Sequence, residues 1–257
     1  MYLSYLLINA GDNPDRPRPG RLWLRNMYRV HQRLSMAFPS AETILEDKDF
    51  LKPYSSESFL HVYGPRTTEQ SFLFRVDSHL GGNPSIVIQS ALKPNWDYAF
   101  HNAQYLLAAR PHLGTYDPRF QDGQLLAFRL LANPTRKKDK ENRPAGKKNW
   151  GTRVPVRREE IEGWLTSRAE RNGFCVESLA NVQTGYALAL KSKEEEGVSQ
   201  VEAGEGTEGR LKRFMYARYE GRLRVTGADA FRNAIIRGIG PGKAFGFGLM
   251  SVASCKS

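Results

Sequence analysis

Tyr28 and His31 stand three residues apart in a segment that reads Asn-Met-Tyr-Arg-Val-His from residue 26. In a helix this spacing makes the two side chains neighbours on one face. An imidazole exchanges a proton near neutral pH, and a tyrosine hydroxyl can position or share that proton. The pair therefore predicts acid–base chemistry on one small substrate group. The alternative is that His31 is only a satisfied residue at the border of an apolar core.

A helix from Arg25 to Phe38 is the element that would position this pair. At 100° per residue it stacks an apolar stripe that should face a sheet, made of Met27, Val30, Leu34 and Phe38. Tyr28, His31 and Ser35 line the adjacent face. The remaining histidines have no spacing typical of metal ligands, so we expect neither a metal site nor a cofactor.

A glycine-rich loop, Gly238 to Gly248, is the second candidate. Backbone amides at Gly240 and Gly242 can approach a phosphate closely, and Lys243 would add charge. The loop is not a nucleotide-binding P-loop, because the glycine spacing is one residue short and Ala244 stands where Ser or Thr is needed. The alternative is a plain helix stop followed by a turn.

Charge predicts a polyanionic partner. The 257 residues carry 38 Lys and Arg against 27 Asp and Glu, a formal net charge of +11, which favours nucleic acid over membrane because no basic amphipathic helix stands out. Two cysteines exclude a disulfide framework, no apolar run is long enough to span a bilayer, and we expect the cytoplasm. The alternative for the most basic segment, Asn133 to Arg158, is a solvated linker. The side chains predicted to bind such a partner are Arg136, Lys137, Lys138, Lys147 and Lys148 in that segment, and Lys191, Lys193, Arg210, Lys212 and Arg213 beside an acidic insert at 194–209.

The order of predicted elements is strand, helix, strand, strand, helix, strand, and it occurs twice. Two such units predict an α+β fold of two tandem ferredoxin-like domains, the βαββαβ arrangement of RNA-recognition motifs. We expect the first at 1–135, a basic linker at 136–151 and the second at 152–257. The first-half elements are strands at 2–8, 72–76, 85–89 and 125–131 and helices at 25–38 and 95–109. The second-half elements are helices at 159–172 and 228–237, strands at 153–156, 174–179, 186–190 and 248–253, and a strand pair within 211–225.

The segment at Asn26 resembles the N-P-Y-x-x-H helix of the CasE family, the CRISPR RNA-processing endoribonucleases of type I-E Cascade complexes. Met27 replaces the usual proline, Gln32 stands where a basic residue often follows the histidine, and the acidic insert is long. Further segments resemble blocks of that family in the same order, namely 128–135, Trp164-Leu165 with Gly173-Phe174, 219–223 and 238–248.

The resemblance implies metal-independent cleavage of the CRISPR repeat RNA at the base of its stem-loop. The ribose 2′-OH would attack the neighbouring phosphate and leave a 2′,3′-cyclic phosphate. His31 would be the general acid or base, and Tyr28 would orient it or the attacking hydroxyl. The family also implies retention of the product and assembly with other Cascade subunits. Two alternatives remain, a non-catalytic RNA-binding subunit of the same complex and a general binder of double-stranded RNA.

Overall fold

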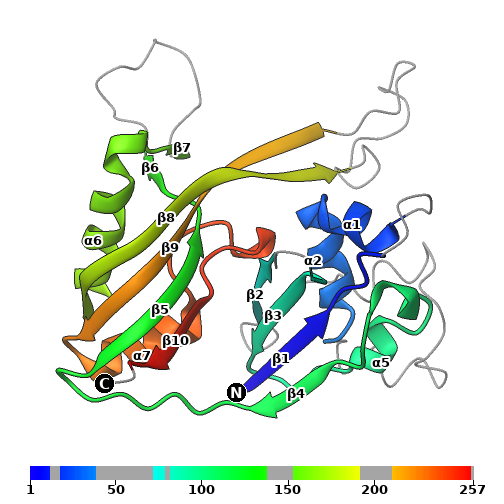
Figure 1. The fold of residues 1–257 in the computed structure, drawn as a ribbon, viewed down its shortest axis with the longest axis horizontal. Helices are drawn as coiled ribbons and strands as arrows, with labels where there is room; N and C mark the ends of the chain where they lie inside the picture. The colour runs from blue at the N-terminus through cyan, green and yellow to red at the C-terminus, as the bar shows by residue number, and fades with distance from the viewer. Residues whose placement is uncertain (12–17, 39–71, 79–81, 138–152, 192–209, 256–257) are drawn as a thin grey trace. The chain divides into compact units, whose positions relative to one another are not determined.

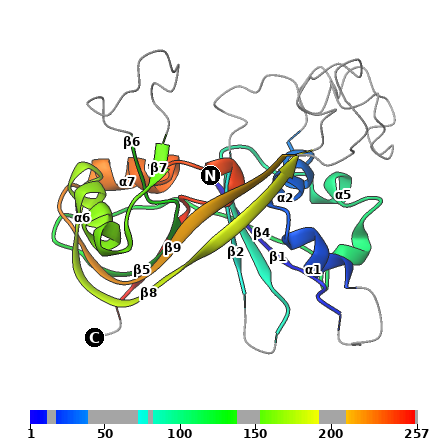
Figure 2. The same ribbon diagram turned by 90° about the horizontal axis from the view of Figure 1, so that it is seen from above.

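The computed structural model describes the chain except for residues 12–17, 39–71, 79–81, 138–152, 192–209 and 256–257. Two four-stranded antiparallel sheets and one two-stranded ribbon make up its strands (Figures 1 and 2). The chain forms two compact units. The first comprises Met1–Asp117, Ala187–Phe214 and Ala244–Gly246, and the second comprises Pro118–Tyr186, Met215–Lys243 and Phe247–Ser257.

The first sheet has the strand order β2-β3-β1-β4 of a ferredoxin-like unit. Helices α2 and α5 cover one of its faces (Figure 2). A short helix and a 3₁₀ turn are added to this plan. The elements are β1 (Tyr2–Leu7), α1 (Pro19–Leu24), α2 (Met27–Ser35), β2 (Phe72–Asp77), β3 (Ser85–Ser90), α5 (Trp96–Ala99), the 3₁₀ turn η2 (Gln104–Leu106) and β4 (His112–Thr115).

The apolar stripe of α2 packs on this sheet as the spacing predicts. Val30 and Leu34 are fully buried with Leu6, Ile86 and Ile88 from the strands. Phe38 is buried in the same cluster, and Met27 packs against it. Burial of such side chains stabilises the unit by about 1.5–3 kcal/mol each, so this stripe fixes which face of α2 is left for chemistry.

The second sheet has the order β10-β5-β9-β8, which is the same ferredoxin-like arrangement. Strands β8 (Phe174–Lys191) and β9 (Arg210–Val225), at one side of this sheet, form a long hairpin that extends well beyond β5 (Figure 1). The elements are β5 (Leu125–Ala132), α6 (Ile161–Arg171), β8 (Phe174–Lys191), β9 (Arg210–Val225), α7 (Ala228–Arg237) and β10 (Met250–Ser254). Two tandem ferredoxin-like units are therefore confirmed.

The basic segment is not wholly irregular. Its two ends, β6 (Thr135–Lys137) and β7 (Arg153–Pro155), pair as an antiparallel ribbon and lead through the 3₁₀ turn η3 (Arg158–Glu160) into α6. Residues 138–152 lie outside the described part.

The division of the chain differs from the predicted one. The strand at 125–131 was expected to close the first sheet, but β5 pairs with β9 and β10 in the second. The first sheet is closed by β4, which pairs with β1 and which we did not predict. The units therefore divide at Asp117 and Pro118 rather than at 135. A strand's own residues predict that it is extended, but they do not specify its partner.

Further predictions about elements are wrong. The two strands expected at 174–179 and 186–190 are the single strand β8. The helix expected over 95–109 is a four-residue helix followed by a 3₁₀ turn, and Arg33 donates to Ala99 O (3.0 Å) and Asn102 Oδ1 (2.9 Å) where the helix ends. The strand pair expected within 211–225 is the single strand β9. Gly221 lies inside this strand rather than at a turn. Glycine is needed there because a Cβ would collide with the carbonyl oxygen of Ser178 on β8.

No helix in the described part of the chain is long and apolar enough to cross a membrane.

Candidate functional site

Tyr28 and His31 lie on α2, and both side chains are half-buried. Asn26 caps the helix, and its side-chain oxygen accepts a hydrogen bond from the backbone N–H of Tyr28 (3.1 Å). The cap fixes the first turn of the helix. Because Tyr28 and His31 are three residues apart, their side chains lie together on the face beside the buried stripe. The predicted pair is thus held by one rigid element.

The ring of His31 stacks on Phe72 of β2, with centroids 5.3 Å apart and planes 20° apart. Its centroid is 6.3 Å from that of Phe74. These contacts restrict the imidazole on one side, while its partial exposure leaves it open to a substrate. Both interpretations of His31, proton-transfer group and packed border residue, agree with this geometry.

The glycine-rich loop adopts the conformations that the sequence predicts. Gly240 and Gly242 have φ of +84° and +78°. A Cβ at Gly242 would lie 2.8 Å from the ring of Phe247, and one at Gly240 would lie 3.0 Å from Trp164. These glycines are therefore needed for packing in the second unit, whatever they contact in addition.

The end of the same loop lies beside the aromatic residues that support His31. A Cβ on Gly246, whose φ is +82°, would come within 3.1 Å of the ring of Phe74. Phe245, one residue earlier, stacks on Phe214 of β9 with centroids 4.2 Å apart. The first unit therefore brings α2, the tip of the glycine loop and the β8–β9 hairpin into one packed group.

Lys243 is exposed in the second unit. Partial desolvation of its ammonium, and then the positive charge of Arg237, lower its pKa below the ordinary value of 10.5. A lysine whose charged form is disfavoured in this way gains from a bound anion.

The structure describes some of the predicted RNA-binding side chains. Four of them are exposed, Arg136 and Lys137 on β6 and Lys212 and Arg213 on β9. Lys191 and Arg210 end β8 and begin β9, and the positions of their side chains are not described. Lys138, Lys147, Lys148 and Lys193 lie outside the described residues.

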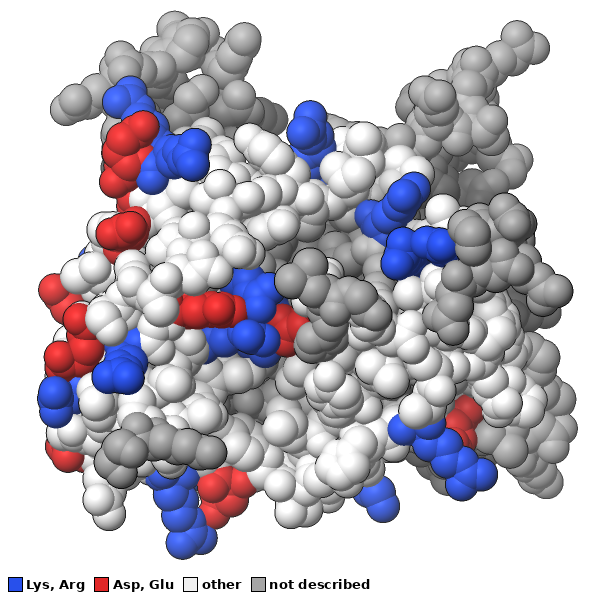
Figure 3. All heavy atoms as spheres, in the orientation of Figure 1, with Lys and Arg blue, Asp and Glu red and all other residues white. Residues whose placement is uncertain are grey.

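Positive charge also gathers at residues that the sequence analysis left without a role. Burial, followed by repulsion from Arg153 and Arg171, lowers the pKa of Arg168 on α6. Lys137 lies directly opposite Arg153 in the β6–β7 ribbon. Like charges this close favour an anionic partner. Figure 3 shows basic side chains in separate groups on the face that it draws.

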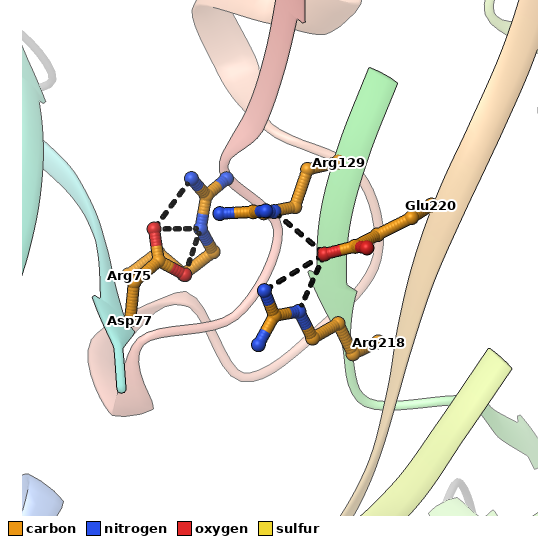
Figure 4. Close-up of polar contacts among 5 residues, drawn as sticks. All are labelled: Arg75, Asp77, Arg129, Arg218 and Glu220. Atoms are coloured by element: carbon orange, nitrogen blue, oxygen red, sulfur yellow. Dashed lines mark hydrogen bonds and ion pairs between the residues drawn. The ribbon is translucent and has the colours of Figure 1, made fainter. Parts of the chain in front are cut away.

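A second group that sequence reasoning missed lies on the face of the second sheet opposite the helices. Register pairs Arg129 of β5 with Glu220 of β9, and Arg129 Nε lies 2.7 Å from Glu220 Oε1. Arg218 Nη2 lies 2.7 Å from the same oxygen (Figure 4). One carboxylate thus holds two guanidinium groups. Only strand pairing brings them together, so no local sequence signal could have found them.

A surface groove of about 950 Å³ lies in the first unit between Lys93 and Arg110, but neither Tyr28 nor His31 lines it. Among the described residues, no three His, Cys, Asp or Glu side chains are grouped so that they could hold a metal ion.

Comparison with known proteins agrees with this architecture over almost the whole chain. The chain is 28% identical over 254 residues to the CRISPR-associated endoribonuclease Cse3 of Thermus thermophilus, covering 98% of this chain and 100% of the relative. It is 25% identical over 256 residues to the Cascade subunit CasE of Escherichia coli, covering 98% and 99%. A solved structure of Cse3 bound to 19-nucleotide RNA has a TM-score of 0.65 at 25% identity, covering 98% of this chain and 100% of that one. A model of the family described as CRISPR associated protein matches residues 1–254. This chain therefore belongs to that family and is homologous to the Cse3 and CasE endoribonucleases.

Proposed function

We propose that this protein is a metal-independent endoribonuclease that recognises the stem-loop of the CRISPR repeat in precursor RNA and cuts it. It then keeps the mature RNA and acts with it as a Cascade subunit in the cytoplasm. The observation that carries the proposal is the Tyr28 and His31 pair on one capped helix, in a chain that matches the Cse3 endoribonuclease over its full length.

The reaction that fits these side chains is transesterification within the RNA. The 2′ oxygen loses its proton and attacks the adjacent phosphorus, which gives a pentavalent phosphorane. The bond to the 5′ oxygen of the next nucleotide then breaks, and that oxygen takes up a proton. The products are a 2′,3′-cyclic phosphate and a 5′-OH, and no other reactant is needed.

His31 performs one of the two proton transfers in this proposal, as base at the 2′-OH or as acid at the leaving oxygen. Tyr28 orients the imidazole or the attacking hydroxyl. Nearby cationic side chains stabilise the added negative charge of the phosphorane. Gln32, which replaces a frequently basic residue of the family, is buried, so we expect this cation to come from another element.

Incubation of the protein with a labelled repeat hairpin in EDTA tests the proposal. We expect one cut, a 3′ end that resists phosphatase until the cyclic phosphate is opened, and no cleavage of a hairpin with a 2′-deoxy nucleotide at the cut. Binding without cleavage would favour the non-catalytic subunit. Equal binding of an unrelated duplex would favour a general binder of double-stranded RNA.

A further inference from the structure

The side chain of Asn26 does more than cap α2. Its oxygen accepts hydrogen bonds from the N–H of Tyr28 and from the N–H of Leu190, both at 3.1 Å. Its amide nitrogen donates to the carbonyl oxygen of Leu190, also at 3.1 Å. Leu190 is the second-last residue of β8. One amide therefore joins the start of the helix that carries Tyr28 and His31 to the distal end of the long hairpin.

A helix cap alone does not require asparagine, because serine, threonine or aspartate also supply the acceptor. The link to Leu190 does require it. Serine is too short to reach a second strand, and aspartate cannot donate to a carbonyl oxygen. Asn95 offers a comparison in the same unit, since it caps α5 by accepting from the N–H of Tyr98 (3.0 Å).

The other strand of the hairpin is fixed to the same unit. Phe214 of β9 stacks on Phe245, and the following Gly246 packs against Phe74, which lies beside His31. Both distal strand segments are thus tied to the surroundings of His31, in accord with the assignment of Ala187–Phe214 to the first unit. Lys212 and Arg213 are exposed in this tied region.

We propose that Asn26 is a positioning residue that holds the distal hairpin against the start of α2, so that RNA bound by Lys212 and Arg213 is presented to Tyr28 and His31. The inference rests on the proposed function. Leu190 is 43% exposed, so water competes for these hydrogen bonds and their loss loosens the hairpin without unfolding the core. A displacement of about 1 Å at the reacting atoms is enough to slow a reaction about 10²-fold.

Two variants separate capping from positioning. Asn26→Asp keeps the acceptor for Tyr28 and loses the donor to Leu190, and Asn26→Ser keeps a cap and loses contact with Leu190. Asn95→Asp and Asn95→Ser are the matched controls at a cap without this link. For each variant we would measure the single-turnover cleavage rate, the Kd of a hairpin made uncleavable by a 2′-deoxy nucleotide, and Tm.

We expect both Asn26 variants to cut about 10- to 100-fold more slowly, with Kd changed less than about threefold and Tm equal to that of the Asn95 variants. Unchanged rates beside a cutting wild type would overturn the positioning role and leave the proposed function standing. Rates that fall only in step with Tm would reduce Asn26 to a cap. A wild type that does not cut would overturn the proposed function and this role with it.

Discussion

Helices α2 and α6 occupy the same place in two units of the same fold, each following the first strand of its βαββαβ arrangement. On α2, the face beside the buried stripe carries Tyr28 and His31. On α6, Trp164 is buried against Tyr219, and Arg168 lies over its ring at 5.5 Å. The fold supplies a helix on a sheet in both cases, and only the side chains make one of them a candidate for catalysis.

The strands differ between the units as well. In the first sheet β2 and β3 have 6 residues each. Their equivalents in the second sheet, β8 and β9, have 18 and 16. The second pair is longer than its sheet needs, and the extra length carries Lys212 and Arg213. The comparison indicates a division of roles, in which α2 supplies the reacting groups and the distal part of the β8–β9 hairpin, which belongs to the first unit, supplies a surface that holds RNA.

His31→Ala is the change with the largest expected effect. We expect the single-turnover cleavage rate to fall by about 10²- to 10⁴-fold with hairpin affinity nearly intact, because a proton-transfer group acts in the transition state and adds little to ground-state binding. Tyr28→Phe should slow cleavage less. The cleavage rate and the Kd of an uncleavable hairpin, measured on the same preparation, check both.

Arg168→Ala on α6 is the counterpart that sharpens this comparison. Loss of its cation–π contact should lower the free energy of unfolding by about 0.5–1 kcal/mol and leave the cleavage rate at saturating protein concentration unchanged.

If His31→Ala cuts like the wild type, α2 has no catalytic role. If His31→Ala instead lowers Tm sharply, stacking on Phe72 is the main contribution of His31.

Periodicity was a reliable guide to α2. A stripe repeating every three to four residues specifies both a helix and its buried face, so the sequence predicts the burial of Val30, Leu34 and Phe38 and the neighbouring position of Tyr28 and His31. Gly173, which directly follows the helix predicted at 159–172, comes after α6 with φ of +71°. These features depend on local geometry, which is why they could be predicted.

Long-range pairing was not predictable in this way. Nothing in residues 125–131 indicates that they pair with β9 and β10, and β4 is only four residues long. Arg129 and Glu220 are 91 residues apart and meet only through strand register. The link from Asn26 to Leu190 has the same origin. Sequence therefore predicted the elements of the site better than the contacts that join them.

Replacing the basic side chains of β9 and of β6 tests whether these two strands bind RNA. Each phosphate contact releases counterions, so affinity for the hairpin should fall by about 10³-fold or more between low and moderate salt. We expect Lys212→Ala with Arg213→Ala, and separately Arg136→Ala with Lys137→Ala, to flatten the plot of log affinity against log salt. A pair that leaves the slope unchanged lies outside the RNA-binding surface, and for the β6 pair the solvated-linker alternative would then stand.

Gly242→Ala and Gly163→Ala form a matched pair for the glycine loop. At Gly242 a Cβ meets Phe247 at 2.8 Å and φ is +78°, so alanine should lower the free energy of unfolding by about 1–3 kcal/mol. At Gly163, inside α6, nothing lies within 4 Å of the added Cβ. Alanine there should raise the free energy of unfolding by about 0.5–1 kcal/mol. Denaturant unfolding measures both. RNA affinity that Gly242→Ala loses only in step with stability would make the loop structural.

Lys243→Ala is expected to have the smallest effect on the fold, within about 0.5 kcal/mol, because the side chain is exposed. A single phosphate contact should nevertheless lower the salt slope by about one. An unchanged affinity, salt slope and cleavage rate would remove Lys243 from the RNA-binding surface.

The lowered pKa of Lys243 predicts a pH dependence of RNA affinity that a lysine without an RNA contact would not produce. Desolvation and Arg237 bring its pKa below 10.5, whereas a bound phosphate favours the charged ammonium and raises it again. Lys243 therefore takes up a proton when RNA binds at alkaline pH values below 10.5. The affinity for RNA then falls as the pH rises through that range. Folding responds with the opposite sign, because the unfolded chain binds more protons there and stability rises with pH. Lys243→Gln should abolish the alkaline loss of affinity for an uncleavable hairpin, and a loss of equal size in wild type and variant would assign it to another group.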